Sequence, residues 1–164
     1  MSPVAFAEAV APLFEGAPGF LRRLARERPF GSDNELLAGA RRLADTAPED
    51  ELLELLDAHP RIGADPAGMS VLSRGEQDDG AGANATLARE LTTLNDAYEK
   101  RFGFRYVVFV AGRPRAAIVP LMRAGLAEDR GAELRRAVGD VIAIAADRLS
   151  GERGADEYAQ EATR

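Results

Sequence analysis

The sequence contains no cysteine and only one histidine, His59, among its 164 residues. The lack of cysteine excludes disulfide bonds, thiolate metal ligands and a cysteine nucleophile, and it suits a reducing cytoplasmic compartment. A zinc or iron site would need several carboxylates besides His59, and no His-x-x-x-His or Glu-x-x-His spacing occurs. We therefore expect no metal.

Excess positive charge and long apolar runs are also lacking. The formal net charge is −6, which argues against a nucleic-acid partner because such proteins need a basic face. No apolar run approaches the roughly 20 residues of a membrane helix. The first residues, Met1 to Glu8, lack the basic start and apolar core of a signal peptide. We expect a soluble cytoplasmic protein without a membrane partner.

Capping signals and apolar spacing predict several helices. Ser2-Pro3 is typical of a helix start, and Ser32 with Glu35 forms a capping box. The same pattern from Thr46 to Glu49 predicts the start of a helix that ends just before His59. A further helix face contains Leu87, Leu91, Leu94 and Tyr98 and is closed by Gly103.

His59 follows an apolar helical run and precedes Pro60, so its backbone is biased away from helical geometry. An imidazole carries or releases a proton near neutral pH. A histidine held at a helix exit therefore suits acid–base chemistry. The alternative is a surface or capping histidine without a catalytic role.

Helical periodicity disappears from Arg61 to Ala83, where glycines accumulate, and this long irregular region is a candidate for function. Within it, Ser73-Arg74-Gly75-Glu76-Gln77 places a hydroxyl, a guanidinium, a carboxylate and an amide close together. The segment also fits a capping box formed by Ser73 and Glu76. Both interpretations can hold together.

Two later features have more than one interpretation. The β-branched and aromatic run from Phe104 to Val110 is typical of an extended segment, yet no second strand is evident to pair with it. The last long helix is predicted from about Asp129 to Leu149, with Arg148 near its end. There the helix dipole alone would explain a cation. Arg148 could also bind a small anion.

His59, Glu76 and Arg148 are the reactive groups that we select by residue type and setting. An imidazole can transfer a proton, a carboxylate can orient it or bind substrate donors, and an arginine can bind a carboxylate or an enolate oxygen. Sequence spacing does not show that the three meet. No Gly-x-Ser-x-Gly, phosphate loop or dinucleotide fingerprint is present, which disfavours nucleophilic hydrolysis and nucleotide chemistry.

Five ordered blocks between about residues 6 and 149 resemble the 2-oxo-4-hydroxy-4-carboxy-5-ureidoimidazoline (OHCU) decarboxylases of urate degradation. The blocks are Phe14-Glu15 near Pro18, Arg28-Pro29-Phe30, Ala58-His59-Pro60-Arg61-Ile62-Gly63, Ser73-x-x-Glu76-Gln77 and Leu94-Asn95-x-x-Tyr98-x-x-x-Phe102-Gly103-Phe104. Together with the helical patterns, the resemblance implies an all-α single-domain bundle of about seven to nine helices with one long irregular loop region. We expect this domain at residues 1–150, followed by a flexible tail at 151–164.

The resemblance also implies an activity and a set of site residues. It implies decarboxylation of OHCU to (S)-allantoin, without metal or organic cofactor, by a homodimer. His59 is similar to the catalytic histidine, Glu76 to the catalytic carboxylate and Arg148 to an arginine of the last helix. His59 would protonate one face of the ring. The implied substrate-contacting residues are Pro60, Ser73, Arg74, Gly75, Gln77, Tyr106, Val107, Val108, Phe109 and Val110.

Two departures from the family pattern bear on the shape of the pocket. Arg105 stands where the family commonly has proline, and the stretch from Asp78 to Ala83 is short and acidic. Two other functions are compatible with the composition, namely a non-catalytic helical interaction module and a related ureide hydrolase that uses His59 as a general base. The interpretation as an interaction module does not explain the polar cluster from Ser73 to Gln77.

Overall fold

The computed structural model describes residues 1–64 and 85–161, with side chains described up to Gly151. This part of the chain forms seven α-helices and one 3-10 helix, and no strand. The elements are α1 (Pro3–Val10), η1 (Ala11–Phe14), α2 (Pro18–Arg26), α3 (Asp33–Thr46), α4 (Glu49–Asp57), α6 (Ala85–Phe102), α7 (Arg115–Leu126) and α8 (Arg130–Glu161). The prediction of an all-α fold is confirmed.

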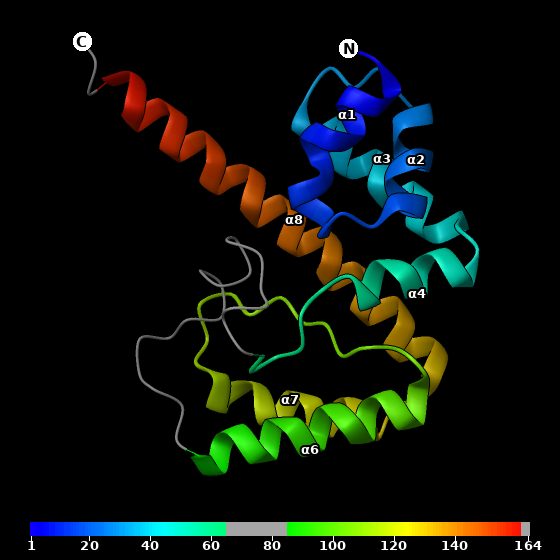
Figure 1. The fold of residues 1–164 in the computed structure, drawn as a ribbon, viewed down its shortest axis with the longest axis vertical. Helices are drawn as coiled ribbons and strands as arrows, with labels where there is room; N and C mark the ends of the chain where they lie inside the picture. Colours follow the sequence, from blue (N-terminus) through cyan, green and yellow to red (C-terminus); the bar gives the residue numbers. More distant parts are fainter. Residues whose placement is uncertain (65–84, 162–164) are drawn as a thin grey trace.

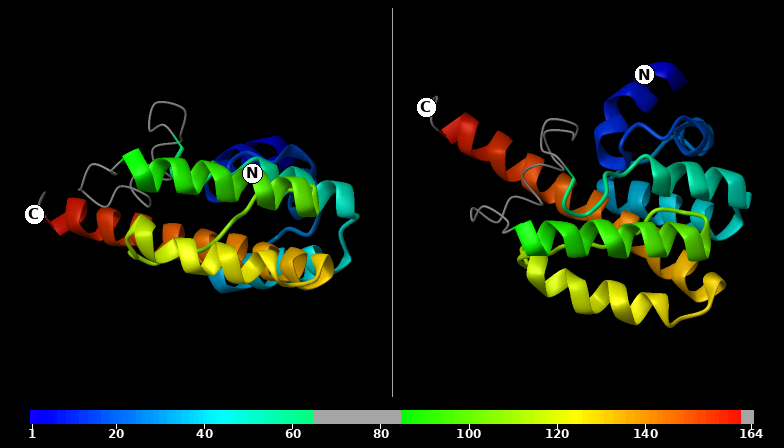
Figure 2. Two further views of the ribbon diagram at one scale, coloured as in Figure 1. Left: turned by 90° about the horizontal axis from the view of Figure 1, so that it is seen from below. Right: turned by 60° about the horizontal axis from the view of Figure 1, so that its bottom comes forward.

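Helix α8 is the central element, running along the body and projecting beyond it at its C-terminal end (Figure 1). It packs against α3, η1 and α4, while α1 pairs with α2 and α6 pairs with α7. Figures 1 and 2 show α6 and α7 side by side at one end of the molecule and α1 to α3 at the other. His59 follows α4, the short helix between these two groups.

Several local predictions from sequence are confirmed by the caps. Ser2 Oγ accepts the Ala5 N–H at 3.1 Å, and Ser32 Oγ accepts the Glu35 N–H at 3.2 Å. Gly103 ends α6 with φ +78° and donates its N–H to the Glu99 carbonyl at 2.9 Å. The cap predicted at Thr46 is wrong, because α3 extends to this residue and its hydroxyl bonds back to the Arg42 carbonyl.

The run from Phe104 to Val110 is a buried extended segment without a partner strand among the described residues. Side chains from other elements form the hydrogen bonds to its backbone that a neighbouring strand would otherwise form. Asp57 Oδ1 accepts the Arg105 N–H at 3.0 Å, Asp140 Oδ2 accepts the Phe109 N–H at 3.2 Å, and Arg136 donates to the Val107 carbonyl at 3.0 Å. The segment is thereby fixed between α4 and α8.

The dipole explanation of Arg148 is wrong, because α8 does not end near Leu149 but continues to Glu161. Arg148 therefore lies within the helix, where the terminal dipole does not act. Its guanidinium turns inward to η1 and is almost fully buried. Among the described residues, no helix is long and apolar enough to cross a membrane.

Candidate active site

His59 lies directly after α4 and is 3% exposed. Leu55 and Leu56 anchor the end of this helix in the core, and Ala58 and His59 donate their N–H groups back to the carbonyls of Glu54 and Leu56. The turn continues the helix geometry just far enough to direct the imidazole inward. Pro60, which follows, is half-buried. A surface location for His59 is thereby excluded.

One ring nitrogen of His59 is fixed, and the other has no partner within the part of the chain that the structure describes. Nδ1 lies 2.8 Å from the Leu55 carbonyl oxygen. A carbonyl can only accept, so we assign the proton of the neutral ring to Nδ1 and a lone pair to Nε2. Nε2 is buried and has no hydrogen-bond partner among the described residues. It is therefore the atom of His59 that is available for a ligand.

Burial lowers the pKa of His59 from 6.5 to about 4, because the charged imidazolium loses its hydration. The bond to the Leu55 carbonyl and the charge of Glu15 act in the opposite direction and raise the pKa. The positive charges of Arg148 and Arg105 lower it further. At neutral pH His59 is thus uncharged in the free protein, and Nε2 is a base.

Arg148 of α8 forms a buried ion pair with Glu15, with 2.6 Å between Nη2 and Oε1. The side chains are 2% and 9% exposed, respectively. Arg148 Nη1 also donates to the Pro12 carbonyl at 2.7 Å. Glu15 has φ +52° at the end of η1, which directs the chain back toward α8. The pair joins the two ends of the sequence beside His59.

The extended segment contains the five residues from Tyr106 to Val110 that were expected to contact the substrate. Tyr106, Val107 and Val108 are buried, while Phe109 and Val110 are half-buried. Arg136 stacks 5.0 Å from the Tyr106 ring centroid and also pairs with Asp140 at 2.8 Å. Burial raises the pKa of the Asp140 carboxyl, while the charge of Arg136 and the Phe109 N–H lower it.

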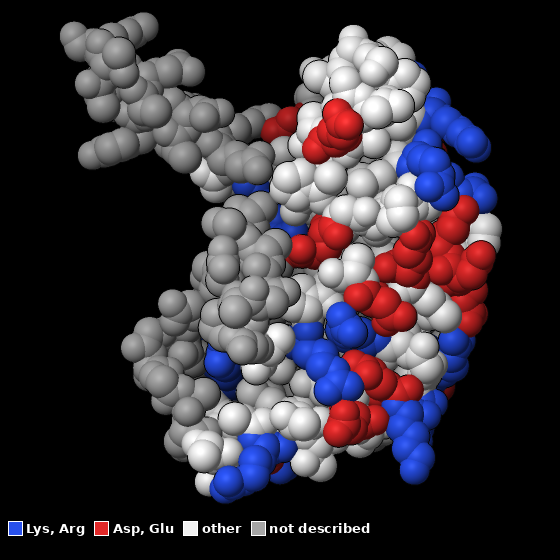
Figure 3. Space-filling model, viewed as in Figure 1, with Lys and Arg blue, Asp and Glu red and all other residues white. Residues whose placement is uncertain are grey.

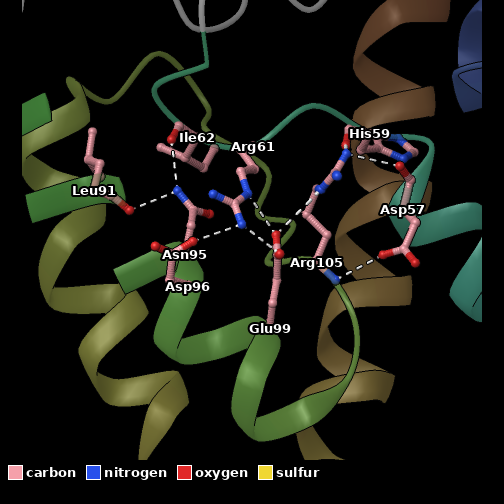
Figure 4. A network of polar contacts seen from close by, with 9 residues as sticks. All are labelled: Asp57, His59, Arg61, Ile62, Leu91, Asn95, Asp96, Glu99 and Arg105. Atoms are coloured by element: carbon pink, nitrogen blue, oxygen red, sulfur yellow. Dashed lines mark hydrogen bonds and ion pairs between the residues drawn. The ribbon is translucent and has the colours of Figure 1, made fainter. Parts of the chain in front are cut away.

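A charged network supports the chain after His59 from outside (Figure 4). Arg61 binds both carboxylate oxygens of Glu99, at 2.9 and 2.7 Å, and also Asp96 at 3.0 Å. Asn95 Nδ2 donates to the Ile62 carbonyl at 3.0 Å. Arg61 and Ile62, which follow His59 closely, are therefore attached to three side chains of α6, those of Asn95, Asp96 and Glu99.

The face of the molecule seen in Figure 3 carries mixed charge. Figure 3 shows acidic and basic side chains interspersed over the part of this face that carries α4 and α6. Ion pairs between elements are among them, such as Arg61 with Glu99 and Arg130 with Glu49.

The structure brings together only part of the predicted site. His59 and Arg148 are close enough for the charge of one to act on the other. The segment from Ser73 to Gln77, with Ser73, Arg74, Gly75, Glu76 and Gln77, lies outside the described residues. Within residues 1–64 and 85–151, no group of three or more His, Asp or Glu side chains could hold a metal ion.

Sequence reasoning missed the roles of Glu15, Arg136 and Asp140. The last two are spaced i and i+4 on α8, which is the one local signal that they act together. Glu15 gave no local signal for its pairing with Arg148, because the two residues lie 133 positions apart in the chain. Its presence in the block Phe14-Glu15 was the only indication.

A buried imidazole with one unpaired nitrogen, next to a buried ion pair in an all-α bundle, is typical of an enzyme that uses acid–base chemistry. The sequence comparisons give the particular family. A model of the OHCU decarboxylase family matches residues 1–150, and the chain belongs to this family.

Two relatives described as 2-oxo-4-hydroxy-4-carboxy-5-ureidoimidazoline decarboxylases are similar over most of their length. The protein of Haloferax volcanii is 31% identical over 147 residues, covering 88% of this chain and 87% of that protein. The protein of Halalkalicoccus jeotgali is 32% identical over 151 residues, covering 88% and 82%. The fold is similar to a crystal structure of an OHCU decarboxylase in the presence of (S)-allantoin, with a TM-score of 0.71, 24% identity and coverage of 86% and 94%.

Proposed function

We propose that the protein decarboxylates OHCU to (S)-allantoin in urate degradation, without a metal or organic cofactor, and that His59 protonates one face of the ring. The observation that carries the proposal is the buried Nε2 of His59, which has no partner among the described residues in a chain of this family. A buried polar atom without a partner is costly in a folded protein. A ligand group that bonds to Nε2 would remove this cost.

The protonation state of His59 suggests an order of events. Because the free imidazole is neutral at pH 7, it must acquire a proton before it can donate one. In the conversion to allantoin, the ring hydroxyl becomes a carbonyl and loses a proton, while the carbon bearing the ureido group gains one. Nε2 can take the proton of the ring hydroxyl. CO2 then leaves, and the electron pair of the broken C–C bond stays behind and is delocalised over the ring. Return of the proton from Nε2 to the carbon bearing the ureido group fixes one face of the product, and a proton from solvent on the ring nitrogen that received the electrons completes allantoin.

The negative charge of the substrate assists this sequence. A carboxylate bound next to His59 favours the imidazolium and raises its pKa in the complex. Arg148, held by Glu15 and the Pro12 carbonyl, is our candidate for binding that carboxylate. Positive charge fixed before the reaction also stabilises the anion that remains when CO2 departs.

The remaining contacts are proposed from the family resemblance. Glu76 would orient the substrate or the imidazole, and Pro60 and the backbone from Tyr106 to Val110 would contact the ring. The described residues place no hydrogen bond on the backbone of Val108, so its peptide groups are available to a ligand. The other proposed contacts are Ser73, Arg74, Gly75 and Gln77.

We further propose a cytoplasmic homodimer whose enzyme domain occupies residues 1–150, with residues 151–164 as a C-terminal extension. The flexible tail expected there does not agree with α8, which continues to Glu161. The family match ends at residue 150, which supports this boundary. Sedimentation equilibrium of the full chain and of residues 1–150 tests both points. We expect two subunits in each case, and a monomer in either sample contradicts the proposal.

The activity is tested by generating the unstable substrate from urate with the upstream enzymes and measuring CO2 release. We expect the wild-type protein to accelerate CO2 release and the His59→Ala variant to match the spontaneous rate. Consumption of substrate without CO2 would indicate a hydrolase. No acceleration by a folded wild-type protein would indicate a non-catalytic module.

A further inference from the structure

Arg105 connects the turn that carries His59 with the extended segment Tyr106–Val110, which follows it in the chain. Its Nη1 donates to the carbonyl of Asp57 at 3.0 Å and to the carbonyl of His59 at 2.8 Å. Its own N–H is accepted by the Asp57 carboxylate at 3.0 Å. In Figure 4 the side chain extends from the segment after Gly103 to the turn that carries His59.

The two carbonyls that Arg105 binds need an external donor. Carbonyls at the end of a helix have no N–H of a following turn to pair with. Those of Asp57 and His59 lie at and just beyond the end of α4. One guanidinium nitrogen satisfies both, which a planar group with several donors can do without changing its rotamer.

Arg105 is itself oriented by α6. Its Nε lies 3.6 Å from Oε1 of Glu99, the same carboxylate that binds Arg61. Glu99 therefore hydrogen-bonds Arg61 and forms a longer ion pair with Arg105, whose Nε has no hydrogen-bond partner among the described residues. The arrangement fixes the peptide of His59 on one side and the side chain of Arg61 on the other.

Within residues 1–64 and 85–151, His59 is consequently restrained at every polar atom except Nε2. Its N–H donates to the Leu56 carbonyl at 3.1 Å, its Nδ1 lies 2.8 Å from the Leu55 carbonyl, and its own carbonyl accepts from Arg105. Of these restraints, only the bond from Arg105 comes from outside the α4 turn. Since Arg105 immediately precedes Tyr106, its bonds also restrain the start of the segment Tyr106–Val110.

We propose that Arg105 is a positioning residue of this enzyme, which holds His59 and the segment Tyr106–Val110 at a fixed separation through its bonds to the carbonyls of Asp57 and His59. The proposal rests on the proposed decarboxylase function. Arg105 does not touch the substrate; it acts through the backbone of His59. The residue thereby gives this chain a link that proline at the same position could not provide, because proline has neither an N–H nor a donor side chain.

The test compares Arg105→Met, Arg105→Lys and the control Arg123→Met. Arg123 is exposed and pairs with Glu90 between α7 and α6, so the control removes one arginine and one ion pair away from the site. We expect kcat to fall roughly 30-fold in Arg105→Met with KM within about threefold of wild type, because small displacements of a catalytic group reduce turnover steeply. Arg105→Lys keeps the charge and one donor head but loses the fork, and we expect a loss of about threefold.

A second readout does not depend on activity. His59 is the only histidine, so labelling histidine with ¹³C at Cε1 gives one NMR signal that reports its ring. Among the described residues, the charged groups acting on it are Glu15 after η1, Arg148 of α8 and Arg105. Removing the positive charge of Arg105 should raise the pKa of His59, and loss of the restraint should shift its signal at neutral pH. Neither change is expected in Arg123→Met.

The two readouts separate the possible failures. If kcat and the His59 titration of Arg105→Met both match those of Arg123→Met, the positioning role is refuted. If Arg105→Met does not fold, full wild-type kcat in Arg105→Lys refutes it equally. If the wild-type protein releases no CO2, the proposed function fails. The NMR titration still tests the positioning role in that case: an unchanged titration of His59 in Arg105→Met overturns it, and a raised pKa of His59 supports it.

Discussion

Protonation of His59 should destabilise the folded protein in a defined pH range. In the unfolded chain the imidazole has a pKa near 6.5, whereas burial lowers the pKa to about 4 in the folded protein. Between these values the unfolded chain binds a proton that the folded protein does not. The free energy of unfolding therefore rises with pH across this range.

The size of the effect follows from the shift. The pKa falls from 6.5 to about 4, and at 1.36 kcal/mol per unit the total is about 3 kcal/mol. His59 is 3% exposed, so solvent screening does not reduce this figure appreciably. The stabilisation is complete above pH 6.5 and is lost as the pH falls through 4. A loss of this size is a large part of the stability of an ordinary domain.

The assay compares wild type with His59→Gln by urea unfolding at pH 7, 5.5 and 4. Glutamine stays uncharged throughout and can donate to the Leu55 carbonyl, and the acidic residues that titrate in this range are common to both proteins. We expect the stability of wild type relative to His59→Gln to fall by about 3 kcal/mol between pH 7 and pH 4. If the difference in unfolding free energy between the two proteins stays constant within about 0.5 kcal/mol, which is far less than the expected change, the buried neutral imidazole is refuted.

Two further variants test the surroundings of His59. Replacing Glu15 by glutamine removes the charge that faces Arg148 and should cost about 3 kcal/mol in urea unfolding, because the buried ion pair between the two side chains is lost. The pKa of His59 should fall further in this variant, as read from the single histidine NMR signal, and an unchanged stability and pKa would show that the pair is unimportant. Replacing Asp140 by alanine removes the acceptor of the Phe109 N–H and a partner of Arg136, so we expect KM to rise roughly tenfold with a smaller change in kcat, as for a lost binding contribution. Asp96→Ala, which removes a contact of Arg61 at an exposed carboxylate, is the matched control and should leave KM within about twofold, since exposed ion pairs contribute little.

The helices were predictable because their signals are local. The face containing Leu91 and Tyr98 repeats within one element, and Gly103 follows it directly, so spacing and capping alone identify α6. His59 at the exit of α4 could be predicted for the same reason. The proline after it and the apolar run before it lie within a few residues.

The contacts that complete the site were not predictable from such patterns. Arg148 meets Glu15 across nearly the whole chain, and no periodicity relates the two. The apolar face of α8 ends at Leu149, but the helix itself continues to Glu161, so its end was placed too early and the dipole explanation of Arg148, one of the two considered, does not hold. Among the described residues the extended segment before Val110 has no partner strand, and side chains of Asp57, Arg136 and Asp140 bond to its backbone instead.

Arg105 illustrates a third case. The sequence shows only that it stands where the family commonly has proline, a departure that bears on the shape of the pocket. The structure shows three hydrogen bonds from Arg105 to Asp57 and His59. The substitution therefore replaces one form of restraint by another in this chain.

The measurement that tests the role of His59 most directly is the handedness of the allantoin formed from substrate generated in situ. Circular dichroism of the product, recorded before spontaneous racemisation, distinguishes one enantiomer from a racemate. We predict (S)-allantoin from the wild-type protein and racemic product at the spontaneous rate from a folded His59→Gln variant. An excess of (S)-allantoin formed by His59→Gln at the wild-type rate would contradict protonation by His59.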